Sequence, residues 1–218
     1  MLEVIQPISK RDQVVRAVKE AILSGSIPAG AAIVEARIAR QVGAGIPLVR
    51  EALIELEHNG FVQRTPYKGT TVTRLEPADI KQIFRLRVEL EGLAIAWARE
   101  NVTPEDIEDL RAVIKKMERA AAELDMDRFY ESDLDFHRKI WLMSGNSYLV
   151  DALERVVVPL FAFFVMKTRR EPESYSESAV MHGKIVEAMS QMEASEVSEL
   201  MKNSLSGWKE DMLKLLFS

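Results

Sequence analysis

The chain has 218 residues, of which 47% are hydrophobic and 29% charged, and its 29 basic and 34 acidic side chains give a net charge of −5. This length fits one large domain or two small ones with a sizeable core, and the composition excludes a disordered chain. The absence of cysteine excludes disulfides, cysteine-based zinc sites and cysteine nucleophiles.

Neither a membrane span nor a secretion signal is found in the sequence. No apolar run reaches membrane-spanning length. The first residues also lack the basic start and apolar stretch of a signal peptide. We therefore expect a cytoplasmic protein with no membrane partner.

The net charge is unevenly distributed along the chain. Residues 1–75 contain 10 Lys/Arg and 7 Asp/Glu, a net of +3, whereas residues 76–218 contain 19 and 27, a net of −8. Such asymmetry indicates a nucleic-acid-binding module joined to a second domain.

The first segment is predicted to form three helices and one hairpin. Ser9 is a candidate N-cap for the first helix, Pro47 suits the first turn of the third, and Gly60 suits a left-handed cap after it. The apolar period then changes from helical spacing to two, which is typical of strands. The expected helices cover about residues 10–25, 34–42 and 47–59, and the strands cover 61–64 and 70–73.

After residue 75 every predicted element is a helix. Thr103 followed by Pro104 is a strong helix start, and Asn146 is a candidate cap for a later one. The polar segment 169–178 contains Pro172 and is expected to be a mobile loop. The expected helices cover roughly residues 78–101, 104–124, 127–144, 147–167, 175–192 and 194–217.

These elements predict a mainly α protein with two domains. Residues 1–75 are expected to form a winged helix-turn-helix with a small β-hairpin, and residues 76–218 an all-α bundle. In a helix-turn-helix the second helix can lie in the DNA major groove. A basic hairpin beside it can contact phosphates or the adjacent minor groove.

Basic side chains in the first segment are candidate DNA contacts: Arg37, Arg40, Arg50, Arg64 and Lys68. Arg50 lies in the first turns of the candidate recognition helix, where arginine can read guanine, while the others would contact mainly phosphate. Two alternatives stay open. Arg37 and Arg40 can be ordinary solvated charges, and Arg50 can pair with Glu51 on the helix surface.

In the second segment, charged and imidazole side chains fall on apolar helix faces. Arg87 and Glu91, four residues apart, lie in one apolar stripe. They can form an internal ion pair, or Arg87 can hold the carboxylate of a ligand. Asp133 and His137, also four apart, form either a core hydrogen bond or half of a metal site. His182 also faces inward, whereas His58 is expected at the surface without a function.

The N-terminal motifs resemble those of GntR-type bacterial repressors over residues 10–75. The matching runs are Ile22–Gly30, Val49–Leu53, Gly60–Val62, and Gly69 with Val72. The resemblance adds Pro47 and Gly69 to the DNA-binding positions. It also reveals a departure, since Gly45 and Ile46 stand where the family has Ser and Arg, so that an N-cap hydroxyl and one DNA-contacting charge are missing.

The C-terminal motifs resemble the FCD domain of the FadR subfamily. They are Arg87 with Glu91, Asp133 with His137, the run Ser144–Asn146, and His182 with Ile185. The resemblance implies a dimerising helical bundle that binds a small effector, in many members with a divalent metal such as zinc, nickel or manganese.

Carried over by position, the metal ligands are Asp133, His137 and His182. The family's last histidine falls at Ser204, beside Asn203, so the fourth ligand is absent or replaced. Arg87, Asn203 and Ser204 are therefore the candidate effector-binding residues, and Trp141, Phe163 and Trp208 are candidate pocket walls.

The sequence thus predicts a homodimeric repressor that binds a double-stranded, pseudo-palindromic operator. A small carboxylate metabolite in the helical domain would relieve repression. Two alternatives are a metal-dependent enzyme in the helical domain, disfavoured by the attached DNA module, and a DNA-binding protein with a degenerate sensor pocket.

Overall fold

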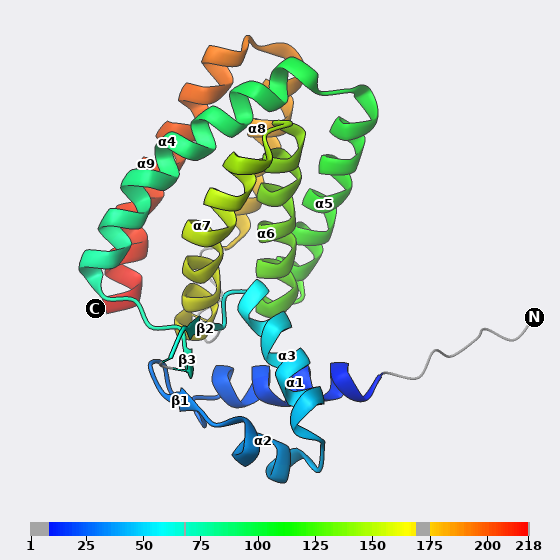
Figure 1. The fold of residues 1–218 in the computed structure, drawn as a ribbon. Helices are drawn as coiled ribbons and strands as arrows, with labels where there is room; N and C mark the ends of the chain where they lie inside the picture. Colours follow the sequence, from blue (N-terminus) through cyan, green and yellow to red (C-terminus); the bar gives the residue numbers. More distant parts are fainter. Residues whose placement is uncertain (1–8, 68, 169–174, 218) are drawn as a thin grey trace, which may run out of the picture. The chain divides into compact units, whose positions relative to one another are not determined.

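A computed structural model describes residues 9–67, 69–168 and 175–217, and the chain divides into two compact units at Arg74 and Leu75 (Figure 1). The predicted boundary after residue 75 lies next to this division. The assignment of DNA binding to one unit and effector binding to the other stays a prediction.

The N-terminal unit has the helix-turn-helix and hairpin expected from the sequence. Its described elements are α1 (Lys10–Leu23), β1 (Ala32–Ile33), α2 (Glu35–Val42), α3 (Ile46–His58), β2 (Val62–Thr65) and β3 (Gly69–Val72). The strands form an antiparallel sheet in the order β1-β3-β2. Strand β1 was not predicted, because two residues are too few for an alternating pattern to be recognised.

Local signals set the ends of these helices. The Ser9 hydroxyl accepts a hydrogen bond from the Asp12 backbone N–H at 3.1 Å, as expected of an N-cap. Gly43 ends α2 with φ +65°, a left-handed conformation that favours glycine. Gly45 precedes α3 without any side-chain cap, so the missing hydroxyl of the motif is not replaced locally.

The C-terminal unit is entirely helical in its described part. The helices are α4 (Pro77–Asn101), α5 (Pro104–Ala122), α6 (Met126–Met143), α7 (Ser147–Thr168), α8 (Tyr175–Gln191) and α9 (Ala194–Phe217). The predicted ranges are confirmed to within about two residues at each end. The predicted loop 169–178 is wrong at its end because α8 already begins at Tyr175, and residues 169–174 lie outside the described part.

Helices α4 and α9 lie side by side (Figure 1), and one glycine permits their close approach. A Cβ atom at Gly92 would lie 2.9 Å from Cγ of Lys202. The Ser198 hydroxyl donates to the Gly92 carbonyl at 2.8 Å and fixes the contact. This packing holds the inner face of α9 against the polar residues of α4.

None of the described helices has the length and apolar character needed to cross a membrane.

Candidate functional site

The predicted DNA-binding residues of the N-terminal unit lie at its surface. Arg37 and Arg40 are on α2, Pro47 and Arg50 on α3, Arg64 on β2, and Gly69 begins β3; all are exposed. Lys68 lies outside the described residues. Ile46, where the motif has an arginine, is 41% exposed at the start of α3.

Arg50 forms an ion pair with Glu35 of α2, and not the predicted alternative pair with Glu51. Its Nη2 lies 2.7 Å from Oε2 of Glu35, and its Nε lies 3.1 Å from both carboxylate oxygens. The hydrogen bonds from Arg50 lower the pKa of Glu35. The Arg50 side chain is still 56% exposed, so the pair orients the guanidinium without covering it.

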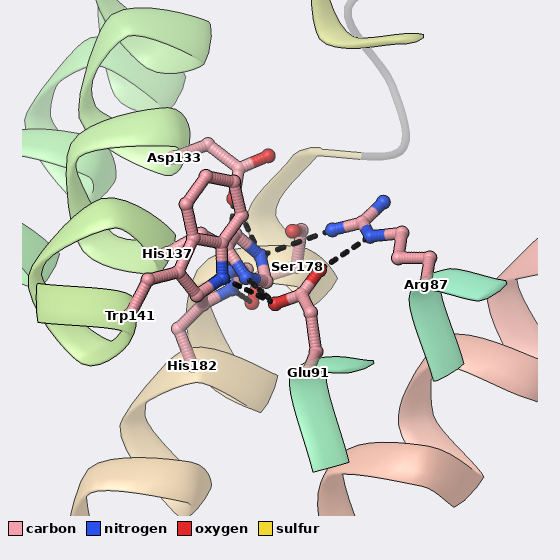
Figure 2. Close-up of polar contacts among 7 residues, drawn as sticks. All are labelled: Arg87, Glu91, Asp133, His137, Trp141, Ser178 and His182. Carbon is pink, nitrogen blue, oxygen red and sulfur yellow. Dashed lines mark hydrogen bonds and ion pairs between the residues drawn. The ribbon is translucent and has the colours of Figure 1, made fainter. Parts of the chain in front are cut away.

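The second group of predicted residues forms a buried polar cluster. Arg87 and Glu91 come from α4, Asp133, His137 and Trp141 from α6, and His182 from α8 (Figure 2). All six are buried. Burying charges is unfavourable unless each meets a partner, so the contacts within the cluster determine whether it is stable.

Glu91 is the centre of this cluster. Its Oε1 accepts from Nε of Arg87 at 2.5 Å, which confirms the predicted internal pair. Its Oε2 is hydrogen-bonded to Nδ1 of His137 and accepts from Nε1 of Trp141 at 3.3 Å. Burial raises the pKa of Glu91, but the charges and hydrogen bonds of His137 and Arg87 together outweigh this effect and lower the pKa to about 2.

Asp133, His137 and His182 converge as a group of potential metal ligands. Each offers one ligand atom, and these atoms lie within 4.8 Å of one another. Oδ1 of Asp133 lies 2.9 Å from Nε2 of His182 and 3.6 Å from Nε2 of His137. Burial raises the pKa of Asp133, but His182, His137 and Arg87 together outweigh this effect and lower the pKa.

The other nitrogen of each histidine is already engaged. Nδ1 of His137 meets Glu91, and Nδ1 of His182 donates to the Ser178 carbonyl at 2.6 Å. This leaves both Nε2 atoms directed toward Asp133. Within the described part of the chain, Oδ1 of Asp133 and Nε2 of His182 are buried without a partner of hydrogen-bond geometry. An oxygen and two imidazole nitrogens so arranged fit a divalent metal.

Arg87 is held in place beside this group with part of its guanidinium unused. Its carbon Cζ lies over the rings of Phe161 and Trp208, 5.0 and 6.0 Å from their centroids. Its Nη2 lies 3.3 Å from Nε2 of His137. Its Nη1 is buried and has no hydrogen-bond partner among the described residues, so one donor remains for a ligand.

A cavity of about 540 Å³ adjoins the cluster. Its wall brings together all the predicted effector and metal residues, namely Arg87, Asp133, His137, His182, Asn203 and Ser204. Trp208 also lines the cavity as expected, whereas Trp141 and Phe163 do not. Sequence reasoning missed Glu177, Ser178 and the other apolar residues of α9, although Met201, Leu205 and Met212 share a helical spacing with Trp208.

Comparisons with known proteins agree with both halves of the chain. The family model "Bacterial regulatory proteins, gntR family" matches residues 10–72, and the model "FCD domain" matches residues 82–207. The Escherichia coli HTH-type transcriptional regulator McbR is 30% identical over 146 residues, which cover 67% of this chain. The match spans 66% of McbR, just under two thirds of its length.

One further relative and one solved structure show the same pattern. A probable D-xylose utilization operon transcriptional repressor of Paenarthrobacter nicotinovorans is 29% identical over 77% of this chain and 73% of that protein. The solved structure of E. coli McbR/YncC superposes with a TM-score of 0.70 and 24% identity, covering 97% of this chain and 98% of that one. The superposition shows that the fold is shared.

Proposed function

The chain is a member of the GntR family of bacterial transcriptional regulators with a C-terminal FCD domain, and we propose that it is a repressor whose operator binding is controlled by a small carboxylate in the helical unit. The observation that carries the effector proposal is the buried, unpartnered Nη1 of Arg87, a residue that lines the cavity together with Asp133, His137 and His182. A guanidinium donor of this kind suits a carboxylate.

DNA recognition would follow the helix-turn-helix mode. Helix α3 enters the major groove, where Arg50 contacts a base edge. Arg37, Arg40, Arg64 and Lys68 neutralise phosphates, and Pro47 and Gly69 let the backbone approach the DNA. Phosphate contacts position the protein, so Arg50 would supply most of the direct readout.

A divalent metal is the second part of the proposal. Asp133, His137 and His182 would hold zinc, nickel or manganese, because a carboxylate and imidazoles accept all three. Glu91 and the Ser178 carbonyl fix the two rings from behind. When bound, the metal would supply positive charge for the carboxylate of the effector. Ser204 stands where the family has a fourth histidine, so the effector could take the place of that ligand.

Removing one ligand tests the metal proposal. We expect the purified chain to take up one equivalent of metal and the His182→Ala variant to lose affinity by more than the ~10–100-fold typical of second-shell changes. Elemental analysis after dialysis and isothermal titration measure this. His58→Ala, a histidine of the other unit, is the matched control. Wild-type protein that stays metal-free, or equal uptake by the variant, would contradict the proposal.

A homodimer is required if two recognition helices are to meet a pseudo-palindromic operator. Leu86 and Leu93 of α4 are 52% and 45% exposed, and with Leu90 and Trp97 they form one stripe of the helix. Leu90 and Trp97 already pack against the core of the helical unit, whereas Leu86 and Leu93 are apolar and exposed. We place the second copy on these two leucines, because it would cover the exposed edge of the stripe.

Disrupting the stripe should separate the copies. The variant Leu93→Glu is expected to sediment as a monomer at micromolar concentration where the wild type is a dimer, because a buried carboxylate would have no partner. Leu124→Glu serves as the control, since Leu124 is 61% exposed and lies outside α4. A wild-type monomer, or a dimeric Leu93→Glu, would remove this assignment.

An enzymatic role is not favoured by any observation on the described residues, and the relatives are regulators.

An operator-binding experiment distinguishes a working sensor from a degenerate sensor pocket. If no carboxylic acid, with or without metal, changes the operator affinity, control by a carboxylate is ruled out.

A further inference from the structure

The cavity beside the metal-ligand cluster has a polar end and an apolar remainder. Arg87, Asp133, His137 and His182 form the polar end. Helix α9 supplies much of the remaining wall through a set of apolar side chains: Met201, Leu205, Trp208, Met212 and Leu215. Their spacings of four, three, four and three residues place them along one side of the helix.

This apolar wall is long compared with a small polar metabolite. Ser204, beside the polar end, and Leu215 are eleven residues apart on α9, which corresponds to roughly 16 Å at the helical rise. Both line the same cavity of about 540 Å³. A cavity of this size lies in the range of pockets that enclose whole ligands. A ligand that reached only the polar end would leave the apolar wall uncovered.

Positive charge is confined to the polar end. Among the lining residues that the structure describes, Arg87 carries the single guanidinium or ammonium group, while Glu177 adds a negative charge. A second carboxylate placed along α9 beyond Ser204 would therefore meet mainly apolar side chains and no positive charge of the described wall. Burying an ionised carboxylate without a partner is strongly unfavourable. The wall thus selects against dicarboxylates whose second charge would lie along α9.

We propose that the effector is an amphipathic monocarboxylate, with its carboxylate at Arg87 and the metal-ligand cluster and an unbranched or aromatic apolar body along α9. This inference rests on the proposed control by a carboxylate, and it narrows the chemical class of the effector. Each methylene removed from water contributes ~0.8 kcal/mol, which is about a fourfold gain in affinity.

Matched acids test the class on the full-length protein by isothermal titration, with and without one equivalent of zinc. We expect octanoate to bind at least tenfold more tightly than butanoate, and at least tenfold more tightly than octanedioate, which differs by one terminal carboxylate. Equal affinity for butanoate and octanoate, or tighter binding of octanedioate, would overturn the inference.

Failure of the inference can be told apart from failure of the proposed function. If succinate or citrate binds and octanoate does not, a carboxylate effector stands and only the amphipathic class is wrong. If none of these acids binds under either condition, the carboxylate effector itself is wrong.

Two leucines of α9 provide a matched pair of variants. Leu215 and Leu213 are both half-buried on the same helix, but only Leu215 lines the cavity. We expect Leu215→Gln to weaken octanoate at least fivefold and leave butanoate unchanged, while Leu213→Gln changes neither. Equal octanoate affinities of the two variants would overturn the placement of the apolar body along α9.

Discussion

Replacing Arg50 by alanine should lower the affinity for a specific operator by about 5- to 150-fold, the equivalent of the 1–3 kcal/mol expected for a bidentate base contact. Arg50 is the one Arg or Lys residue of α3, since Ile46 stands where the family motif has its other arginine. The effect is therefore concentrated in one side chain. Fluorescence anisotropy with an operator selected from a randomised pool, at fixed salt, measures it.

Two control variants separate base reading from general attraction. Arg37→Ala should weaken binding about equally on all sequences and reduce the salt slope by about one. Glu35→Gln keeps the charge of Arg50 but removes its ion pair, so the ratio of specific to non-specific affinity should fall because the guanidinium is no longer oriented. Unchanged operator affinity in Arg50→Ala would refute the role assigned to Arg50.

Replacing Glu91 by alanine should lower the free energy of unfolding of the helical unit by about 3–5 kcal/mol, because a buried charge loses its partner. Arg87 and Glu91 are each only 1% exposed, and His137 also bonds to this carboxylate. At this chain length the loss corresponds to a melting temperature lower by roughly 6–20 °C. Thermal and urea unfolding followed by circular dichroism measure both quantities.

Glu89 on the same helix is the matched control. It pairs with Lys202 at 2.9 Å, but its side chain is 66% exposed. Exposed ion pairs contribute about 0–1 kcal/mol, so Glu89→Ala should be nearly neutral. Equal destabilisation by the two variants would mean that the buried network has no special role in stability.

The same carboxylate predicts a pH dependence. The pKa of Glu91 is lowered from 4.5 to about 2, so the folded state favours the ionised form. Its contribution is fully present above pH 4.5 and is lost as the pH falls toward 2, when the carboxylate takes up a proton. The free energy of unfolding should therefore fall more steeply between pH 5 and 3 in the wild type than in Glu91→Gln.

The helices and the direction of their inner faces follow from local sequence patterns. The 3.6-residue period and local caps such as Thr103 with Asp106 act over one turn, so they are readable without knowing the packing. Helical spacing also predicted that Arg87, Asp133, His137 and His182 face inward, and all four line one cavity.

The partners that these side chains meet depend on how the helices pack against one another. Arg50 meets Glu35, fifteen residues away, and not its neighbour Glu51, because α2 and α3 pack together. Glu91, expected only to pair with Arg87, also binds His137 and Trp141 of α6. The apolar wall of α9 joins the site only because α9 packs on α4. Periodicity fixes the face on which a residue lies, but the partner across that face depends on contacts between segments far apart in the chain.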